Sequence, residues 1–258
     1  MKKLSGVFIC LLLFTVLSSA RIIEVADAGI TDKLKAVIAA KNAPAGGGTP
    51  YTKYIGDNTS GSPSMDYAGA EDTMLYESNN GYNYGITATI EVGKYSSGGY
   101  RMVLIKFSGL SNIPATATVT GATFYFYNTA STATQTVTMR RMLLNWAEGS
   151  QDGAEGDPNW TYLANPTAWT TGGALSDGND RSAAVTCSFE ITNAGSQYYS
   201  CTSAQLIADV QNFVDGGQSN YGWHLERTDG ADDSVYMTYQ SSEGTNGQRP
   251  YLKVDYTD

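Results

Sequence analysis

The sequence predicts an all-β protein, a jelly-roll-like antiparallel β-sandwich, and three observations support this prediction. Short segments that alternate apolar and polar residues recur from residue 51 onward, as in strands with one buried face. Clusters rich in Gly, Asn and Ser separate many of these segments, as in sandwiches whose strands are joined by turns. Charged residues make up 16% of the chain and hydrophobic residues 41%. That balance suits a folded core and excludes a disordered acidic tail or a coiled coil.

The first twenty residues have the pattern of an export signal. Two lysines precede an apolar run over residues 7–17, and Ser-Ser-Ala at positions 18–20 supplies the small residues that a signal peptidase accepts. The run is shorter than the ~20 apolar residues of a membrane span. We therefore expect a signal peptide over residues 1–20, with cleavage after Ala20 preferred and cleavage after Ala28 as the second choice. An uncleaved anchor is the alternative. The mature protein is expected to be secreted, extracellular or at the cell surface, with no membrane span.

Removal of the leader changes the cysteine content of the chain. Cys10 leaves with the leader, and Cys187 and Cys201 remain. Because an oxidising compartment favours pairing of two such thiols, we expect a disulfide between them, and the chain-entropy model gives it about 3 kcal/mol. A free pair or a metal site is the alternative, although two cysteines without a nearby histidine argue against zinc.

Residues 21–50 are expected to form an N-terminal arm or linker, and residues 51–258 the β-sandwich domain. Residues 31–41 combine a Thr cap with good helix formers, which predicts one short helix. Residues 44–50 are rich in Pro and Gly, as flexible linkers are. A spacer, a docking arm and a pro-region are all consistent with this segment.

The sandwich domain is predicted to contain strands, one helix and one long loop. The strands are predicted over residues 86–92, 101–107, 123–127, 135–146, 184–192, 221–227, 235–241 and 251–256. A short amphipathic helix is predicted near residues 203–215, because Ser203 can cap it, an apolar stripe follows, and two glycines end it. Residues 147–181 are predicted to be a long loop, and such excursions on a compact sandwich are usually functional.

Several motifs occur in a characteristic order. They are Tyr82-Asn83-Tyr84-Gly85, RMVLIKF at 101–107, Leu110-Ser111-Asn112-Ile113-Pro114, Trp146-Ala147-Glu148, Asn220-Tyr221-Gly222-Trp223, Ser241-Ser242-Glu243 and Arg249-Pro250-Tyr251-Leu252. This ordered set covers residues 72–256 and resembles the DNRLRE-type domain, a secreted β-sandwich module. That family includes polysaccharide-binding modules attached to alginate lyases and disaggregatase-related proteins. The resemblance implies a jelly-roll-like sandwich with a carbohydrate-binding or surface-structural role and without catalysis.

Candidate ligand-binding residues lie in the long loop and on one strand. Sugar binding needs aromatic faces for pyranose rings and polar groups for hydroxyls. Trp160, Tyr162 and Trp169 meet the first need, and the alternative is that these rings hold the loop on the sandwich. Arg140 and Arg141 are candidates for binding the carboxylates of a uronic-acid polymer, since arginine pairs with carboxylates in a bidentate way. A structural role is the alternative for such strand arginines.

Two acidic segments are candidates for a structural calcium ion. Asp177, Asn179 and Asp180 form one, and Asp229 and Asp232 belong to the other. Both offer the oxygen ligands that calcium prefers, but neither has the spacing of an EF-hand. Acidic turns without a metal are the alternative, and no cofactor is expected to be required.

Catalysis is not expected. His224 is the single histidine, which excludes a multi-histidine metal site, and a structural role is the default for it. Glu148 and Glu243 offer a carboxylate pair for glycoside hydrolysis. The elements W-x-E and S-x-E that contain them, however, resemble scaffold elements of the DNRLRE-type domain. Trp146 and Trp223 lie within strand motifs and are expected in the core.

These observations predict an extracellular, non-catalytic module that binds a polysaccharide or a cell-surface glycan. One alternative is a structural subunit of a surface layer, sheath or fibre that self-associates through residues 21–50. A second alternative is a glycan-degrading enzyme. The excess of 25 acidic over 16 basic residues excludes a basic nucleic-acid-binding protein.

Overall fold

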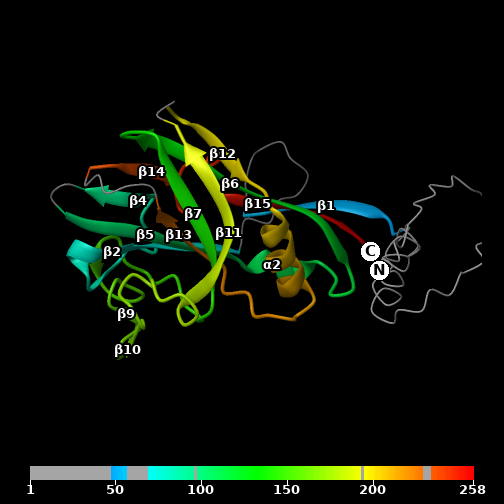
Figure 1. Ribbon diagram of the computed structural model, residues 1–258, viewed down its shortest axis with the longest axis horizontal. Coiled ribbons are helices and arrows are strands. Elements are labelled where there is room, and N and C mark those ends of the chain that lie inside the picture. The colour runs from blue at the N-terminus through cyan, green and yellow to red at the C-terminus, as the bar shows by residue number, and fades with distance from the viewer. Residues whose placement is uncertain (1–47, 57–68, 96–97, 193–194, 229–233) are drawn as a thin grey trace, which may run out of the picture. The chain divides into compact units, whose positions relative to one another are not determined.

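The computed structural model describes residues 48–56, 69–95, 98–192, 195–228 and 234–258. The predicted signal peptide, the predicted helix at 31–41 and nearly all of the predicted arm lie outside these ranges. The described residues belong to one compact unit in which strands predominate, so the all-β prediction is confirmed (Figure 1). No helix in this described part is long and apolar enough to cross a membrane.

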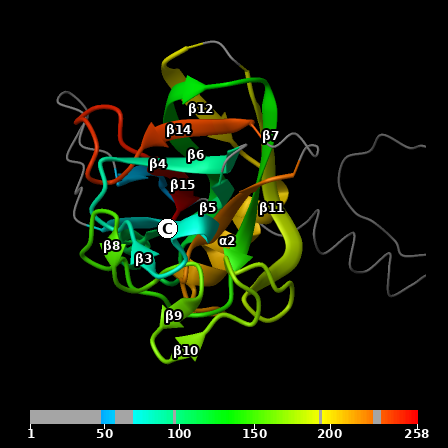
Figure 2. The ribbon, with the colours of Figure 1, turned by 90° about the vertical axis from the view of Figure 1, so that its left-hand side faces the viewer.

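One eleven-stranded antiparallel sheet forms the body of the described chain. Its strands are β1 (Pro50–Ile55), β2 (Ala70–Tyr76), β4 (Thr89–Tyr95), β5 (Gly98–Phe107), β6 (Thr118–Ser131), β7 (Gln135–Met142), β11 (Arg181–Ile191), β12 (Gln197–Cys201), β13 (Trp223–Arg227), β14 (Tyr236–Gln240) and β15 (Tyr251–Thr257). They follow the order β1-β15-β6-β14-β4-β5-β13-β7-β11, while β12 pairs with β6 and β2 with β5. The sheet curls, so that one face encloses the main core in a sandwich-like fold (Figure 2).

All the predicted strand segments overlap strands of this sheet, but the prediction missed β1, β2 and β12. The prediction also extended the strand at 135–146 too far, because β7 ends at Met142. Pro50, expected in the linker, begins β1 and pairs with Thr257. Residues 72–75 of β2 are all buried, so this strand lacks the alternation on which the prediction relied.

The predicted amphipathic helix is confirmed as α2 (Ala204–Val214). The Ser203 side chain accepts a hydrogen bond from the Leu206 backbone N–H at 2.9 Å, which caps the first turn. The helix packs against β6 and β11, and the ring of Phe213 meets that of Trp223 edge-on at 5.4 Å. Trp223 and Trp146 are buried, as expected for core residues.

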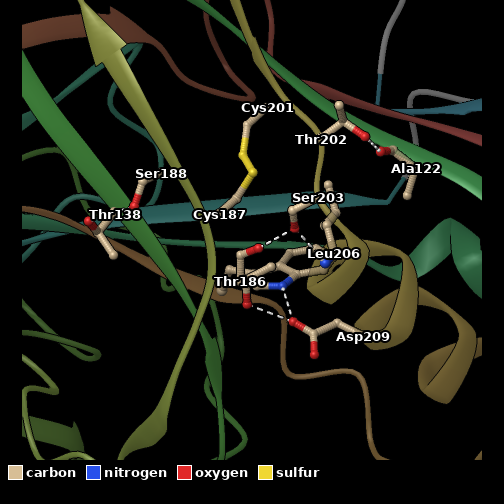
Figure 3. The surroundings of a disulfide bond; sticks show 11 residues. Ala122, Thr138, Thr186, Cys187, Ser188, Cys201, Thr202, Ser203, Leu206 and Asp209 are labelled. Atoms are coloured by element: carbon tan, nitrogen blue, oxygen red, sulfur yellow. Dashed lines mark hydrogen bonds between the residues drawn. A yellow bond between two sulfur atoms is a disulfide. The ribbon is translucent and has the colours of Figure 1, made fainter. Parts of the chain in front are cut away.

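The predicted disulfide joins Cys187 of β11 to Cys201 of β12, with Cα atoms 6.3 Å apart (Figure 3). Both cysteines are buried, and the chain turns directly from Cys201 into α2. Beside the bridge, Thr186 donates a 2.6 Å hydrogen bond to the carboxylate of Asp209 on α2. The disulfide and this hydrogen bond thus tie β11 to the segment that contains β12 and α2.

The sheet has a second, smaller core on the face opposite the main one. Val103, Ile105 and Phe107 of β5 point into the main core, whereas Met102 and Leu104 of the same strand belong to the second. The second core also contains residues from β2, β7, the segment directly after β7 and the predicted long loop, among them Leu75, Met142, Trp146, Trp169 and Ala174. The loop therefore covers the outer face of the sheet.

Candidate functional site

Residues 147–181 form an ordered covering layer with short strands of its own. β8 (Ala154–Glu155) pairs with β3 (Tyr82–Asn83), and β9 (Tyr162–Ala164) pairs with β10 (Thr167–Ala168). These strands lie together on one side of the molecule (Figure 2). This pairing of backbone groups orders the path of the loop.

Two of the three predicted ring contacts lie inside this layer. The side chain of Trp169 is 5% exposed, and its Nε1 donates a 2.8 Å hydrogen bond to the carbonyl oxygen of Asn159. Trp160 is half-buried against the second core, and its ring lies over Gly172 and Gly173. Both indoles therefore hold the loop on the sheet, which is the alternative role weighed for them above.

Tyr162, the third predicted ring contact, lines a pocket of about 470 Å³. The pocket is lined by residues 78–82, from the end of η1 (Glu77–Asn79) to the first residue of β3, and by loop residues 155–157, 159, 162 and 165. Tyr82 supplies a second ring and is 38% exposed. We call this feature the Tyr82–Tyr162 pocket.

A buried asparagine holds the two sides of this pocket together. Asn83 is fully buried, and its Nδ2 donates hydrogen bonds to the carbonyl oxygens of Glu148 at 2.9 Å and Pro158 at 3.0 Å. Its Oδ1 accepts from the backbone N–H groups of Gly85 and Gln151, both at 3.1 Å. Since Asn83 follows Tyr82 on β3, these bonds also hold the backbone from which the Tyr82 side chain projects.

A second buried asparagine shapes the loop side of the pocket. Asn159 Oδ1 accepts hydrogen bonds from the N–H groups of Thr161 at 2.9 Å and Tyr162 at 2.8 Å. Its Nδ2 donates to Asp157 Oδ1 at 2.8 Å, and Asp157 Oδ2 accepts from the N–H of Asn165 at 2.7 Å. Such hydrogen bonds between a side chain and the backbone stabilise a tight turn. Here the turn places Tyr162 at the pocket.

The chemistry of the pocket suits a neutral, hydroxyl-rich ligand. Asn80, Asn165 and Glu155 line it with exposed amide and carboxylate groups, which can donate to and accept from hydroxyls. The two tyrosines add ring surface for an apolar face of a sugar. None of the lining residues is basic and two are acidic, so a polyanion is disfavoured there.

The structure does not bring Arg140 and Arg141 to this pocket. Both lie on β7, where Arg140 pairs with Glu226 at 3.2 Å and Arg141 with Asp209 at 3.6 Å. Each side chain is mostly buried, and Arg181 adds a second ion pair to Glu226 at 2.8 Å. These arginines therefore balance internal carboxylates, in keeping with the structural role weighed for them.

The first predicted calcium segment is engaged in loop contacts. Asp180 is fully buried, and its two oxygens accept hydrogen bonds from the backbone N–H groups of Thr170, Thr171 and Ser176, at 2.9–3.2 Å. Asp177 forms an ion pair with Arg181 at 2.9 Å, and Asn179 Nδ2 donates to the hydroxyl of Ser176. The other two predicted ligands, Asp229 and Asp232, lie outside the described residues.

A different set of carboxylates comes together elsewhere. One oxygen from each of Asp72, Glu148 and Glu243 lies within 4.8 Å of the others. Burial and, next, the charge of Glu243 raise the pKa of Asp72 well above its usual range. Burial, together with the charge of Glu243, raises the pKa of Glu148 to about 7. The two glutamates carry motifs that the sequence singled out, whereas no local signal marked Asp72.

Tyrosines also form a ladder on the solvent side of the sheet. Tyr251 stacks on Tyr125 of the neighbouring strand at 4.5 Å and 8°, and Tyr54 and Tyr198 lie 6.3 and 5.6 Å from it. A ring stacked on its neighbour has a covered face, so the ladder stabilises strand pairing more than it offers ring surface to a ligand.

Comparison of the sequence with models of known protein families found no match, and comparison with curated proteins found none.

Proposed function

We propose that this protein is an extracellular, non-catalytic module that binds a neutral polysaccharide in the Tyr82–Tyr162 pocket. The observation that carries the proposal is the pairing of two tyrosine rings with amide and carboxylate groups around a concavity of about 470 Å³. That volume falls in the usual range of small-ligand sites, about 300–1,000 Å³. The resemblance to the DNRLRE-type domain supports the polysaccharide, and the export-signal pattern together with the buried disulfide supports secretion.

The rigidity of the pocket favours binding. Asn83 and Asn159 fix the backbone on both sides through hydrogen bonds, so little conformational entropy is lost when a sugar enters. The acidic lining favours a neutral polymer over a uronic-acid polymer, because two carboxylates line the pocket without a basic partner among the lining residues.

Affinity electrophoresis of the full chain tests the proposal, with neutral glucans, mannans, xylans and galactans compared with uronic-acid polymers. We expect retardation by at least one neutral polymer. Tyr82→Ala and Tyr162→Ala should each weaken binding about tenfold, since a central aromatic contact contributes roughly 1–2 kcal/mol.

Tyr51→Ala is the matched control, because Tyr51 is exposed on β1 and does not line the pocket. Failure of every neutral polymer to retard the folded protein would overturn the proposal. The proposal would also be overturned if Tyr82→Ala and Tyr162→Ala both bound the polymer with the affinity of the wild type.

A glycan-degrading enzyme is the second candidate, and the proximity of Glu148 to Glu243 favours it. The raised pKa of Glu148, about 7, suits a general acid. This candidate predicts that the wild-type protein releases sugars from the polymer that it binds and that Glu148→Gln abolishes the release. If the protein binds a polymer but releases no sugars from it, the non-catalytic binding function is favoured over the enzyme.

A structural subunit is the remaining alternative, and the arm that would mediate its assembly lies almost entirely outside the described residues. Size-exclusion chromatography of the chain with and without residues 21–47 tests it. An oligomer that dissociates on truncation would favour assembly over glycan binding as the main role.

A further inference from the structure

We propose that Asp72, Glu148 and Glu243 bind one calcium ion where the long loop begins. Asp72 lies on β2, Glu148 follows β7 at the start of the loop, and Glu243 lies in the turn after β14. This inference goes beyond the proposed function and does not depend on it.

The spacing of the three carboxylates fits one calcium ion. Calcium binds oxygen ligands at about 2.3–2.6 Å, so two oxygens on the same ion lie at most about 5 Å apart. One oxygen of each carboxylate lies within 4.8 Å of the other two. Glu243 is exposed, which gives an ion and its water ligands access from solvent.

An unpartnered buried oxygen points independently to a ligand. Asp72 is fully buried, and its Oδ2 accepts a 2.6 Å hydrogen bond from the Ser242 N–H, but its Oδ1 has no partner among the described residues. Leaving a buried acceptor unsatisfied is unfavourable, and more so for a charged one. A cation bound by Oδ1 would satisfy it.

The hydroxyl of Tyr239 is a second buried atom without a partner in the described part of the chain. Burial and, next, the charge of Asp72 raise the pKa of this hydroxyl, so it lies within the electrostatic reach of the same carboxylate. Among the described residues, an oxygen of Asp72 and the hydroxyl of Tyr239 are therefore both open to a ligand.

Within the described part of the chain, no cationic side chain forms an ion pair with the cluster. None of the ion pairs between described residues includes Asp72, Glu148 or Glu243. Lys106 and Arg101, on the adjacent β5, pair instead with Glu71 at 2.8 Å and Glu91 at 3.0 Å. A divalent cation would neutralise most of this charge and remove the repulsion between the carboxylates.

A bound ion would join three distant parts of the fold. Glu148 Oε1 accepts a 2.8 Å hydrogen bond from the Asp72 N–H, and the Glu148 carbonyl accepts from Asn83. Calcium would therefore fix the start of the loop to β2 and to the turn after β14, which stabilises the folded state without a requirement for sugar.

Calorimetric titration and thermal unfolding of the full chain, first stripped with EDTA, test the proposal with calcium chloride as the probe. We expect one calcium ion per chain. Magnesium should bind more weakly, because it requires a nearly ideal octahedral arrangement of ligands. At calcium concentrations about a hundred times the Kd, the Tm should rise by about 5–10 °C.

Glu243→Gln is the decisive variant, because an exposed side chain can change without disturbing the fold. It should weaken calcium binding at least about tenfold, and Asp72→Asn should do the same if it folds. Glu190→Gln, at an exposed position on β11, should bind calcium as the wild type does. The proposal is overturned if the wild type binds no calcium, or if Glu243→Gln binds it with unchanged affinity, which would place the ion elsewhere. Neither outcome bears on sugar binding.

Discussion

Arg181 donates a hydrogen bond from Nη1 to Nδ1 of His224 across 3.0 Å. Because arginine has no acceptor, Nδ1 must be unprotonated, and Nε2 then carries the proton that it donates to the Gly173 carbonyl at 3.0 Å. His224 is fully buried on β13, and Gly173 belongs to the long loop. The single histidine of the chain thus joins the loop to the sheet in its neutral form.

This arrangement predicts how stability depends on pH. Burial and, next, the charge of Arg181 lower the pKa of His224 from 6.5 to about 3. Between these values the unfolded chain binds a proton that the folded chain does not. The contribution of His224 to the free energy of unfolding therefore falls as the pH falls through this window, by up to about 1.4 kcal/mol per pH unit.

Urea denaturation of the wild type and of His224→Gln, between about pH 4 and 7, measures this contribution. The variant should be less stable by about 1–3 kcal/mol near pH 7, because a buried hydrogen bond is lost. The difference in the free energy of unfolding between the two proteins should narrow as the pH falls, because only the wild type loses the contribution of His224. All other titrating groups are present in both proteins. A difference that stays constant with pH would contradict the prediction.

Asn83→Ala should loosen the long loop. The substitution leaves the N–H groups of Gly85 and Gln151 and the carbonyls of Glu148 and Pro158 without their partner. We expect a loss of about 3 kcal/mol or more in the free energy of unfolding, with faster proteolytic cleavage and amide exchange within residues 147–181.

Asn246→Ala is the control for this measurement, because Asn246 is exposed in a turn and its loss should change stability by no more than about 0.5 kcal/mol. If Asn83→Ala leaves the loop as protected as in the wild type, the loop is held by its indole rings and not by Asn83.

Local patterning was sufficient to predict most strands of the sheet and the helix α2, although β1 and β12 were missed. Alternation in β6 and the cap of α2 depend on neighbours within a few residues, and both were predicted. In β2 and β5 the second core buries both faces, so alternation is weak, and β2 was missed. Whether the far side of a strand is covered depends on a loop distant in the chain, which local patterning does not reveal.

The candidate sites show the same limit. The sequence identified the long loop and Tyr162, but Tyr82 lies far upstream and reaches the pocket only because β3 pairs with β8. Glu148 and Glu243 were singled out as a pair, while Asp72 completes the cluster from a strand that lacked a recognisable pattern. When strand pairing brings residues together from distant parts of the chain, the sequence around each residue does not indicate that they are in contact.

The disulfide should contribute measurably to stability. Cys187 and Cys201 close a loop of sequence separation 14, for which the chain-entropy model gives about 3 kcal/mol. The double variant Cys187→Ala with Cys201→Ala should lose that amount in urea denaturation, and alanine leaves no unsatisfied hydroxyl at these buried positions. A reductant should destabilise the wild type and leave the double variant unchanged. Equal sensitivity of both proteins to reductant would contradict a role for this bridge.

Two glycines of the loop test whether Trp160 is packed rigidly. Gly173 and Gly178 both have left-handed backbone conformations, with φ of 74° and 83°. A Cβ at Gly173 would lie 2.7 Å from two ring atoms of Trp160, whereas a Cβ at Gly178 would meet nothing within 4 Å. Alanine is strained at either position by about 1–2 kcal/mol, so Gly178→Ala measures the backbone effect alone.

Gly173→Ala should lose that amount and about 1–3 kcal/mol more, because the ring must shift against the second core. Urea denaturation gives the two free energies of unfolding, and tryptophan fluorescence should change in Gly173→Ala but not in Gly178→Ala. If both variants lose the same free energy with unchanged fluorescence, the Trp160 ring moves aside without resistance. The loop would then be held mainly by hydrogen bonds such as those of Asn83 and Asp180, because a ring that yields freely contributes little packing energy.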